Sequence, residues 1–463
     1  MSNVTTVVNP ATEAPLAQVP VLGADEADAA VARALRAGPA WRAVAPADRA
    51  RLLRRLAAQV EEHAEELAQL ETANVGKPIG ESRDEVAMVA EVFYFYAGAV
   101  DKHRGATVPV AGGVDMTFHE PLGVVAAIVP WNFPIAITSW KVGPALATGN
   151  TVIVKPAEIT PLTALRLAEL ALDAGIPEGV LQVVTGRGSV VGTRLIEHPD
   201  VAKVAFTGST EVGREVMSRA SGTIKRVTLE LGGKSASVVF ADADVERAAA
   251  ATPGGVFANA GQDCCARSRA LVQRPVFDRY LELLADAVEG WTVGDPTDPA
   301  IKMGPLVTQN QHDVVAGFLA AGMGEPGGGV VPAHTRGAVP DGPGFWFPPT
   351  VVAPADPGWR MAREEIFGPV LAVIPFDDED DAVRLANDTP FGLSGSIWTR
   401  DSARSLRMAR AVQAGNLSVN SNSSVRVQTS FGGMKQSGFG RELGLEALAA
   451  YSDVKNVFVS TEG

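Results

Sequence analysis

The sequence contains very little cysteine: two residues in 463, and these are neighbours, Cys264 and Cys265. A disulfide between adjacent residues is strained, so we expect two free thiols in a reducing compartment. The first residues also lack the basic and apolar pattern of a secretory or organellar address. These absences argue against a disulfide-stabilised secreted protein and favour a cytoplasmic location.

Long apolar runs and an excess of positive charge are missing as well. No window approaches the ~18 to 20 uninterrupted apolar residues that a membrane span needs. The formal net charge is -13, whereas nucleic acids and anionic lipids attract basic surfaces. We therefore expect no nucleic acid and no membrane as partners, and the sequence predicts no metal site.

The chain does have length and apolar content, with 463 residues of which 46% are hydrophobic. Because a single core stops growing at about 250 to 300 residues, at least two domains are expected. Apolar residues at helical spacing predict two amphipathic helices over 25–73 and a third over 81–100. Short β-branched apolar runs then alternate with helical segments. The predicted strands are 122–129, 151–154, 180–184, 203–206 and 227–231, followed by a second series from 237 that includes 270–273, 370–376, 394–398 and 417–420.

This alternation predicts an α/β protein with two doubly wound, parallel, Rossmann-like domains, an architecture that binds dinucleotides at the carboxyl ends of its strands. Between the strands, helices are predicted over 161–174, 278–288 and 380–386. The first has Thr160 as its expected N-cap, Pro161 at its first position and Gly175 just past its end. The Gly/Pro-rich stretch 322–349 is predicted to be a surface loop.

Three segments carry candidate chemistry, and each also has an ordinary structural interpretation that is favoured when the segment is taken alone. The turn Thr207–Ser209 before a helix can hold a pyrophosphate on free N–H groups, or can simply be a tight turn. Glu230, at the end of an apolar strand, can be a general base with a raised pKa, or a paired carboxylate. Cys264 and Cys265 can supply a nucleophile, or be inert core.

Eight motifs in order resemble the aldehyde dehydrogenase superfamily: VPWNFP, VKPAE, FTGSTEVG, LELGGKS, GQDCCA, EEIFGPV, PFGLSGSIWT and FGGMKQSGFGRELG. The likeness extends over residues 8–459. Because Glu230 is present, the chain is similar to the hydrolytic, acid-forming branch. The resemblance implies an NAD-binding domain (1–101 and 122–232), a catalytic domain (233–435) and a small β oligomerisation arm (102–121 and 436–463), with Gly112 and Gly113 at a hairpin and assembly into a homodimer or homotetramer.

The resemblance also implies a catalytic apparatus. Cys264 would attack the aldehyde to give a thiohemiacetal, and Asn132 with the backbone N–H of Cys264 would stabilise the oxyanion. Loss of hydride to the nicotinamide would leave a thioester, and Glu230 would activate the water that cleaves it. NAD is the expected cofactor, with NADP possible. Its predicted contacts are Ile128, Trp131, Lys155, Glu158, Gly208, Ser209, Gly213, Leu231, Glu365 and Phe367.

The resemblance places a substrate tunnel at Phe133, Trp140, Asp263, Cys265, Val425 and Phe431, all of which can equally be ordinary core residues. Asp263 and the stretch SVRVQTSFGGMKQSG look similar to members that oxidise aminoaldehydes or γ-glutamylamino aldehydes. Three alternatives stay open: a broad-specificity or semialdehyde dehydrogenase, a cysteine-dependent ester or thioester hydrolase, and a catalytically silent homologue.

Overall fold

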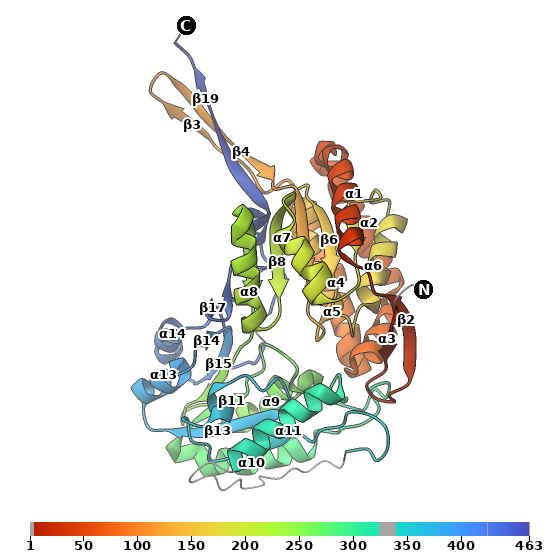
Figure 1. Ribbon diagram of the computed structural model, residues 1–463. Helices are drawn as coiled ribbons and strands as arrows, with labels where there is room; N and C mark the ends of the chain where they lie inside the picture. The colour runs from red at the N-terminus through yellow and green to blue at the C-terminus, as the bar shows by residue number, and fades with distance from the viewer. Residues whose placement is uncertain (1–3, 324–338, 424, 463) are drawn as a thin grey trace.

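A computed structural model describes residues 4–323, 339–423 and 425–462. It contains two six-stranded sheets, one above the other in Figure 1, and a three-stranded arm that extends away from them. None of the helices in these ranges combines the length and the apolar character that crossing a bilayer requires.

The chain begins with a hairpin of β1 (Val4–Val8) and β2 (Pro15–Pro20), followed by four helices. These are α1 (Ala24–Ala43), α2 (Pro46–Glu62), α3 (Ala64–Val75) and α4 (Ile79–Ala99). The prediction of two helices over 25–73 was wrong, because that stretch forms three. Pro46 stands at the first position of α2 and disfavours a helical conformation for the residue before it, which is extended, so α1 ends before this point.

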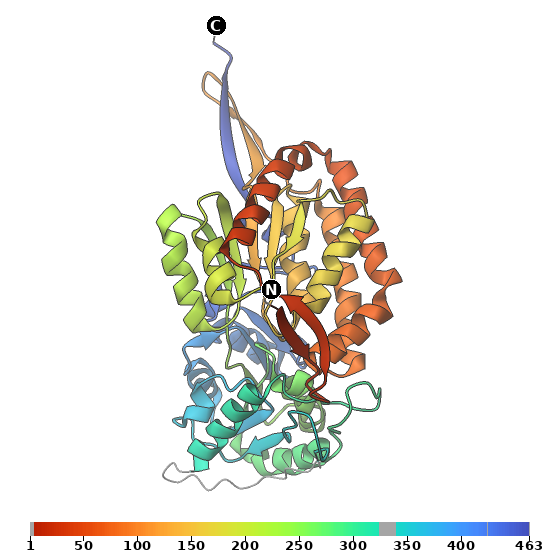
Figure 2. The same cartoon turned by 45° about the vertical axis from the view of Figure 1, so that its right-hand side comes forward.

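The first sheet has the strand order β18-β9-β8-β5-β6-β7 and is parallel except for β18, as predicted for a doubly wound domain. Helices α1, α7 and α8 cover one face, while α5 and α6 pack on the other (Figures 1 and 2). The strands are β5 (Val124–Ile128), β6 (Thr151–Lys155), β7 (Leu181–Val183), β8 (Val201–Thr207), β9 (Arg226–Glu230) and β18 (Gly438–Phe439); the helices are α5 (Pro134–Ala147), α6 (Leu162–Asp173), α7 (Thr193–Glu197) and α8 (Thr210–Ala220).

The predicted start of α6 was one residue too early. Pro161 is the N-cap, and the Thr160 hydroxyl is buried without a hydrogen-bond partner among the described residues. Asn74 of α3 instead accepts the N–H of Leu162 at 3.3 Å, so a tertiary contact takes the place of the predicted cap. Gly175 does follow the helix with φ +90°, as expected.

The second sheet has the order β12-β13-β11-β10-β15-β16 and is parallel throughout. Its strands are β10 (Ala236–Val239), β11 (Arg269–Gln273), β12 (Thr350–Val352), β13 (Val370–Phe376), β15 (Ser394–Trp398) and β16 (Asn416–Val419). The helices around it are α9 (Val245–Val256), α10 (Phe277–Glu289), α11 (Gln309–Met323), α12 (Arg360–Arg363), α13 (Glu379–Asn387) and α14 (Ser402–Ala411). Of the predicted loop 322–349, residues 322 and 323 instead form the end of α11, residues 339–349 contain no helix or strand, and 324–338 lie outside the described residues.

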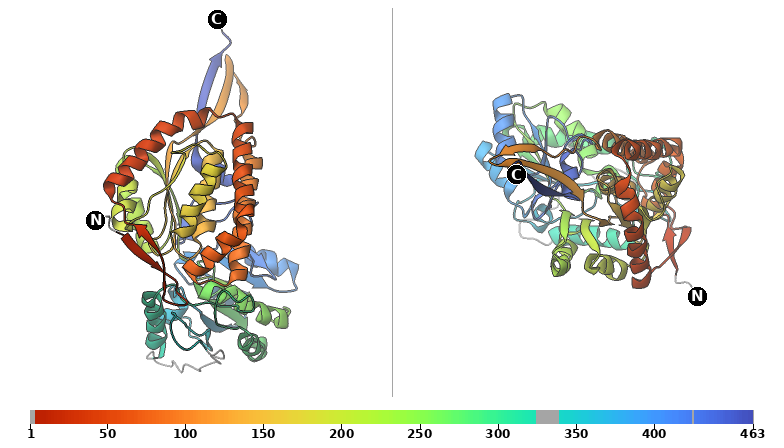
Figure 3. Two further views of the ribbon diagram at one scale, coloured as in Figure 1. Left: turned by 90° about the vertical axis from the view of Figure 1, so that its right-hand side faces the viewer. Right: turned by 90° about the horizontal axis from the view of Figure 1, so that it is seen from above.

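The arm consists of β19 (Ser452–Ser460), β4 (Gly113–Pro121) and β3 (Thr107–Val110) in that order, and Figure 3 shows it projecting beyond the first domain. Gly112, with φ +76°, lies in the β3–β4 hairpin as expected. The segment 436–463 does not belong to the arm as a whole, because β18 joins the first sheet beside β9. This close pairing requires glycine: at Gly438, with φ +114°, a Cβ would lie 1.9 Å from the Leu229 carbonyl oxygen.

Candidate active site

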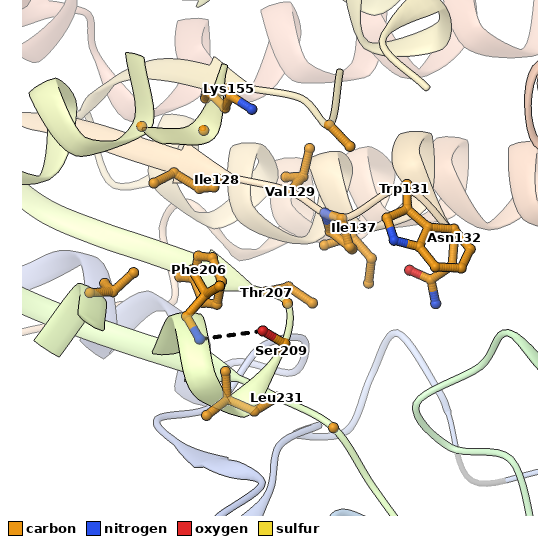
Figure 4. Close-up of a pocket in the computed structure, with 18 of the residues that line it drawn as sticks. Ile128, Val129, Trp131, Asn132, Ile137, Lys155, Phe206, Thr207, Ser209 and Leu231 are labelled. Carbon is orange, nitrogen blue, oxygen red and sulfur yellow. Dashed lines mark hydrogen bonds between the residues drawn. The ribbon is translucent and has the colours of Figure 1, made fainter. Parts of the chain in front are cut away.

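A cavity of about 680 Å³ lies between the two sheets, at the carboxyl ends of β5, β6 and β8. Figure 4 shows side chains from both ends of its first-domain wall, with Lys155 at one end and Asn132 at the other. Residues from the second domain complete the cavity. Those among the predicted site residues that line it are Ile128, Trp131, Asn132, Phe133, Lys155, Glu158, Gly208, Ser209, Leu231, Cys264, Glu365 and Phe367.

The turn between β8 and α8 presents the beginning of a helix to this cavity. The hydroxyl of Ser209, the N-cap, accepts the N–H of Val212 at 3.3 Å (Figure 4). The remaining N–H groups of the first turn have no partner within the helix, and the helix dipole makes this end attractive to an anion. The turn is therefore able to hold a pyrophosphate.

Gly213, a predicted cofactor contact, does not line the cavity. A Cβ at this position would lie 2.6 Å from the side chain of Leu231, which does line it. The glycine allows α8 to pack closely against Leu231, so its contribution to the cavity wall is indirect.

Lys155 and Glu158 lie together where β6 ends. Glu158 accepts the backbone N–H of Gly188 at 3.1 Å, which fixes the carboxylate at the cavity rim. Burial lowers the pKa of Lys155, and the neighbouring Glu158 opposes this shift. Lys155 can donate hydrogen bonds to the hydroxyl groups of a ribose, and the neighbouring Glu158 carboxylate can accept hydrogen bonds from them.

Glu365 enters the cavity from the second domain. Its Oε1 accepts the N–H of Gly233 at 2.8 Å, and a Cβ at Gly232 would lie 2.1 Å from its Oε2. Burial raises the pKa of Glu365 to about 7. The Lys155–Glu158 pair, the helix start and this second carboxylate fit the two riboses and the pyrophosphate of a nicotinamide dinucleotide.

The thiols follow a loop of unusual backbone conformation. Asn259, Ala260 and Gly261 have φ of +47°, +55° and +70°. Asn132 Nδ2 donates to the carbonyl oxygen of Gln262 at 2.9 Å, which leaves its second amide hydrogen available. No protein group among the described residues accepts the backbone N–H of Cys264. Asn132 and Cys264 line the same cavity and thus can offer two donors to one oxyanion.

The Cys264 thiol is held in its protonated form. A hydrogen bond with Cys265, burial, and the neighbouring carboxylates Asp263 and Glu365 all raise its pKa. The two sulfur atoms and a carboxylate oxygen of Asp263 lie within 4.8 Å of one another. Formation of a thiolate at Cys264 therefore requires removal of its proton or a compensating positive charge.

The structure does not place Glu230 on the cavity wall beside Cys264. Both of its carboxylate oxygens are buried without a hydrogen-bond partner among the described residues. Burial, then the charge of Glu442, raises its pKa, and Lys141 opposes this. A Cβ at Gly432 would lie only 2.8 Å from Oε1, so the carboxyl group points toward that segment.

Most of the predicted tunnel residues do not line this cavity either; Phe133 does. Trp140, Cys265 and Phe431 belong to the buried core of the first domain, where the rings of Trp140 and Phe431 lie 5.1 Å apart. Val425 packs against the same core, and the Asp263 carboxylate accepts the N–H of Cys265 at 2.8 Å.

Sequence reasoning missed two residues at the loop that leads to Cys264: Asn259, which begins the loop, and Glu81, which contacts it. Glu81 Oε2 accepts the N–H of Asn259 at 3.0 Å, and Asn259 Nδ2 donates to the carbonyl oxygen of Asn132, also at 3.0 Å. An acid in the first turn of a helix is common and gives no signal of such a contact.

A doubly wound fold whose dinucleotide-sized cavity ends at a thiol is that of a nicotinamide-dependent oxidoreductase. Residues 1–457 match the model of the aldehyde dehydrogenase family, and the chain belongs to it. It is accordingly an NAD(P)-dependent enzyme that acts on aldehydes, as the resemblance implied.

Individual relatives agree with this assignment. The chain is 44% identical to the NADP/NAD-dependent aldehyde dehydrogenase PuuC of Escherichia coli, covering 98% of this chain and 92% of that protein. It is 42% identical to a betaine aldehyde dehydrogenase of Mesorhizobium japonicum, with 98% and 93% covered. Its fold is similar to that of PnpE from Pseudomonas sp. WBC-3, with a TM-score of 0.96 at 42% identity over 100% and 95% of the two chains. A crystal structure of PnpE contains nicotinamide adenine dinucleotide.

Proposed function

We propose that the enzyme oxidises aldehydes to carboxylic acids through a covalent intermediate on Cys264. The observation that carries this proposal is the shared cavity wall: Cys264, Asn132, Lys155 and Glu158 line one cavity, with Asn132 and Lys155 at opposite ends of its first-domain wall (Figure 4). A dinucleotide bound along the cavity presents its nicotinamide as the hydride acceptor. After the Cys264 thiol has released its proton to solvent water, the thiolate adds to the aldehyde carbon, while the Asn132 amide and the Cys264 N–H stabilise the resulting oxyanion.

Glu230 is proposed as the base for the hydrolytic step. Loss of hydride from the thiohemiacetal leaves a thioester on Cys264, and a water must then attack its carbonyl carbon. Within the described part of the chain, no hydrogen bond holds the Glu230 carboxyl beside Glu442, so a change of side-chain rotamer can turn it toward the cavity. Its ionised form would accept the proton of the water.

The proposed substrates are short ω-amino aldehydes. The carboxylate of Asp263 lies within 4.8 Å of the Cys264 sulfur, where it can attract the ammonium group of such a substrate. Burial raises the pKa of Asp263, and the N–H of Cys265 and then the charge of Arg267 oppose this shift. An ammonium group beside the carboxyl would further favour its ionised form. The relative from Mesorhizobium japonicum, 42% identical, is named for betaine aldehyde, a cationic aldehyde, which supports this choice.

The test compares 4-aminobutanal, butanal and succinate semialdehyde, each with NAD and with NADP, by following NADH or NADPH absorbance. We expect kcat/KM to be about tenfold higher for the amino aldehyde than for butanal, and lowest for the anionic semialdehyde, because a charge pair about 4 Å apart contributes about 1 kcal/mol in water and about 4 kcal/mol near a protein surface. In Asp263→Asn, whose side-chain oxygen can still accept the Cys265 N–H, the preference should disappear. A preference that persists in this variant would contradict the role of Asp263.

We also propose that the arm joins subunits into a dimer or tetramer. β19 is an edge strand of its sheet, and Phe118, Val454 and Phe458 are 45%, 63% and 52% exposed on the arm. An open, apolar strand edge favours pairing with a second copy of the chain. Light scattering should give a multiple of the monomer mass, and deletion of 453–463 should reduce it.

A further inference from the structure

A carboxylate of the first domain is built into the loop that carries the thiol. Glu81 lies in the first turn of α4, and its Oε2 accepts the N–H of Asn259 at 3.0 Å. Asn259 begins the loop that leads to Cys264. Glu81 does not line the cavity, so its place is behind the reacting groups.

The loop needs such support because of its backbone. Asn259 and Ala260 are left-handed, with φ of +47° and +55°. A residue other than glycine in this conformation adds about 1 to 3 kcal/mol of strain and persists only where neighbouring groups hold it. Glu81 satisfies the first N–H of this strained run.

The side chain of Asn259 connects this loop to Asn132, one of the two proposed oxyanion donors. Its Nδ2 donates to the carbonyl oxygen of Asn132 at 3.0 Å and to that of Gln262 at 3.3 Å. The amide of Asn132 donates to the same Gln262 oxygen at 2.9 Å. The carbonyl group of Gln262, two residues before Cys264, therefore orients the side chain of Asn132. This side chain and Cys264 line the same cavity.

We infer that Glu81 and Asn259 are positioning residues for the oxyanion site. The Glu81 carboxylate fixes the backbone of Asn259, and the Asn259 amide fixes Asn132 and the Gln262 peptide relative to the Cys264 N–H. The inference rests on the proposed function, because it concerns the addition of the thiol to an aldehyde. It predicts that Glu81 acts on the chemical step and leaves cofactor binding unchanged.

The experiment measures the rate of NADH formation in the first turnover, by stopped flow at saturating NAD and aldehyde. In Glu81→Ala we expect a decrease of about 10- to 100-fold, because a displacement of about 1 Å at a reacting group has effects of this size. The KM for NAD should stay within about twofold. Asp84→Ala, which removes an exposed acid one turn further along α4, is the matched control and should change the rate by less than about twofold.

A double-mutant cycle separates positioning from general damage to the fold. If Glu81 acts through Asn132, Glu81→Ala in an Asn132→Ala background should lower the rate further by less than about threefold. An equal decrease in both backgrounds would overturn the inference. Glu81→Gln, whose amide oxygen can still accept the Asn259 N–H, should keep more activity than Glu81→Asp, whose side chain is shorter. If Glu81→Ala does not fold, the comparison of these two variants tests the inference in its place.

The wild-type protein distinguishes the two possible failures. If it forms no NADH with any aldehyde of the panel, the proposed function fails. If it does so and Glu81→Ala matches it, only the positioning role of Glu81 is wrong.

Discussion

The two ends of the cavity are built in opposite ways. At the dinucleotide end, the polar groups lie where regular elements begin or end, and two of them already have partners: Ser209 accepts the N–H of Val212, and Glu158 accepts that of Gly188. At the thiol end, an irregular loop with left-handed residues carries the chemistry. There, the Glu230 carboxyl has no hydrogen-bond partner among the described residues.

This difference suggests a division of labour. Paired groups on strand ends and helix starts form a rigid receptor for a ligand of constant shape. A buried polar group without a partner destabilises the fold by about 1 to 3 kcal/mol, and its presence at the thiol end fits a group that gains its partner only during reaction.

The largest effect is expected from the two neighbouring thiols. Cys264 lines the cavity, whereas Cys265 is buried in the core of the first domain. Cys264→Ala should lower kcat by at least about 10⁴-fold, because no thiol then remains on the cavity wall. Cys265→Ala should keep activity within about threefold. Steady-state NADH formation measures both, and an equal loss in the two variants would refute Cys264 as the nucleophile.

A smaller effect, with a different kinetic signature, is expected at Glu230. In Glu230→Gln the first turnover should still release about one NADH per site, after which the steady rate falls by about 10²- to 10⁴-fold. The thioester should accumulate and be visible in the mass of the intact protein. If the steady rate were unchanged, another group would be the base.

The pH dependence of this step follows from the raised pKa of Glu230. Burial and the charge of Glu442 favour the protonated carboxyl, which cannot accept a proton from water. Hydrolysis should therefore be slow at low pH and accelerate as the pH rises through that raised pKa. The residual steady rate of Glu230→Gln should lack this rise.

Much of the fold could be predicted from the sequence because strands buried on both faces form continuous apolar runs. The bounds of β13 (Val370–Phe376) and β15 (Ser394–Trp398) were predicted to the residue. The predictions failed where a contact between residues far apart in the sequence determines the bounds of an element or the sheet that it joins. Asn74 replaces Thr160 at the start of α6, and β18 joins the first sheet through a glycine contact more than two hundred residues away in sequence.

The same reasoning explains what could be predicted of the site. Lys155, Ser209 and most other expected cofactor contacts lie at element ends, and they line the cavity. Trp140 was placed by the resemblance, and Glu230 by its position at the end of an apolar strand together with the resemblance, and neither gives the direction of a side chain. The Trp140 ring packs in the core, and the Glu230 carboxyl points toward Gly432.

The smallest effect is expected at the dinucleotide end. Glu158→Gln keeps an acceptor for the Gly188 N–H but removes the negative charge. The KM for NAD should rise about 3- to 10-fold, since a hydrogen bond to a charged group contributes about 1 kcal/mol more than a hydrogen bond to a neutral group. Use of NADP relative to NAD should improve by about tenfold, because the carboxylate no longer repels the 2′-phosphate. The first-turnover rate at saturating cofactor should not change. If it fell together with cofactor affinity, the receptor and the reacting end would be coupled, and the contrast between them would not hold.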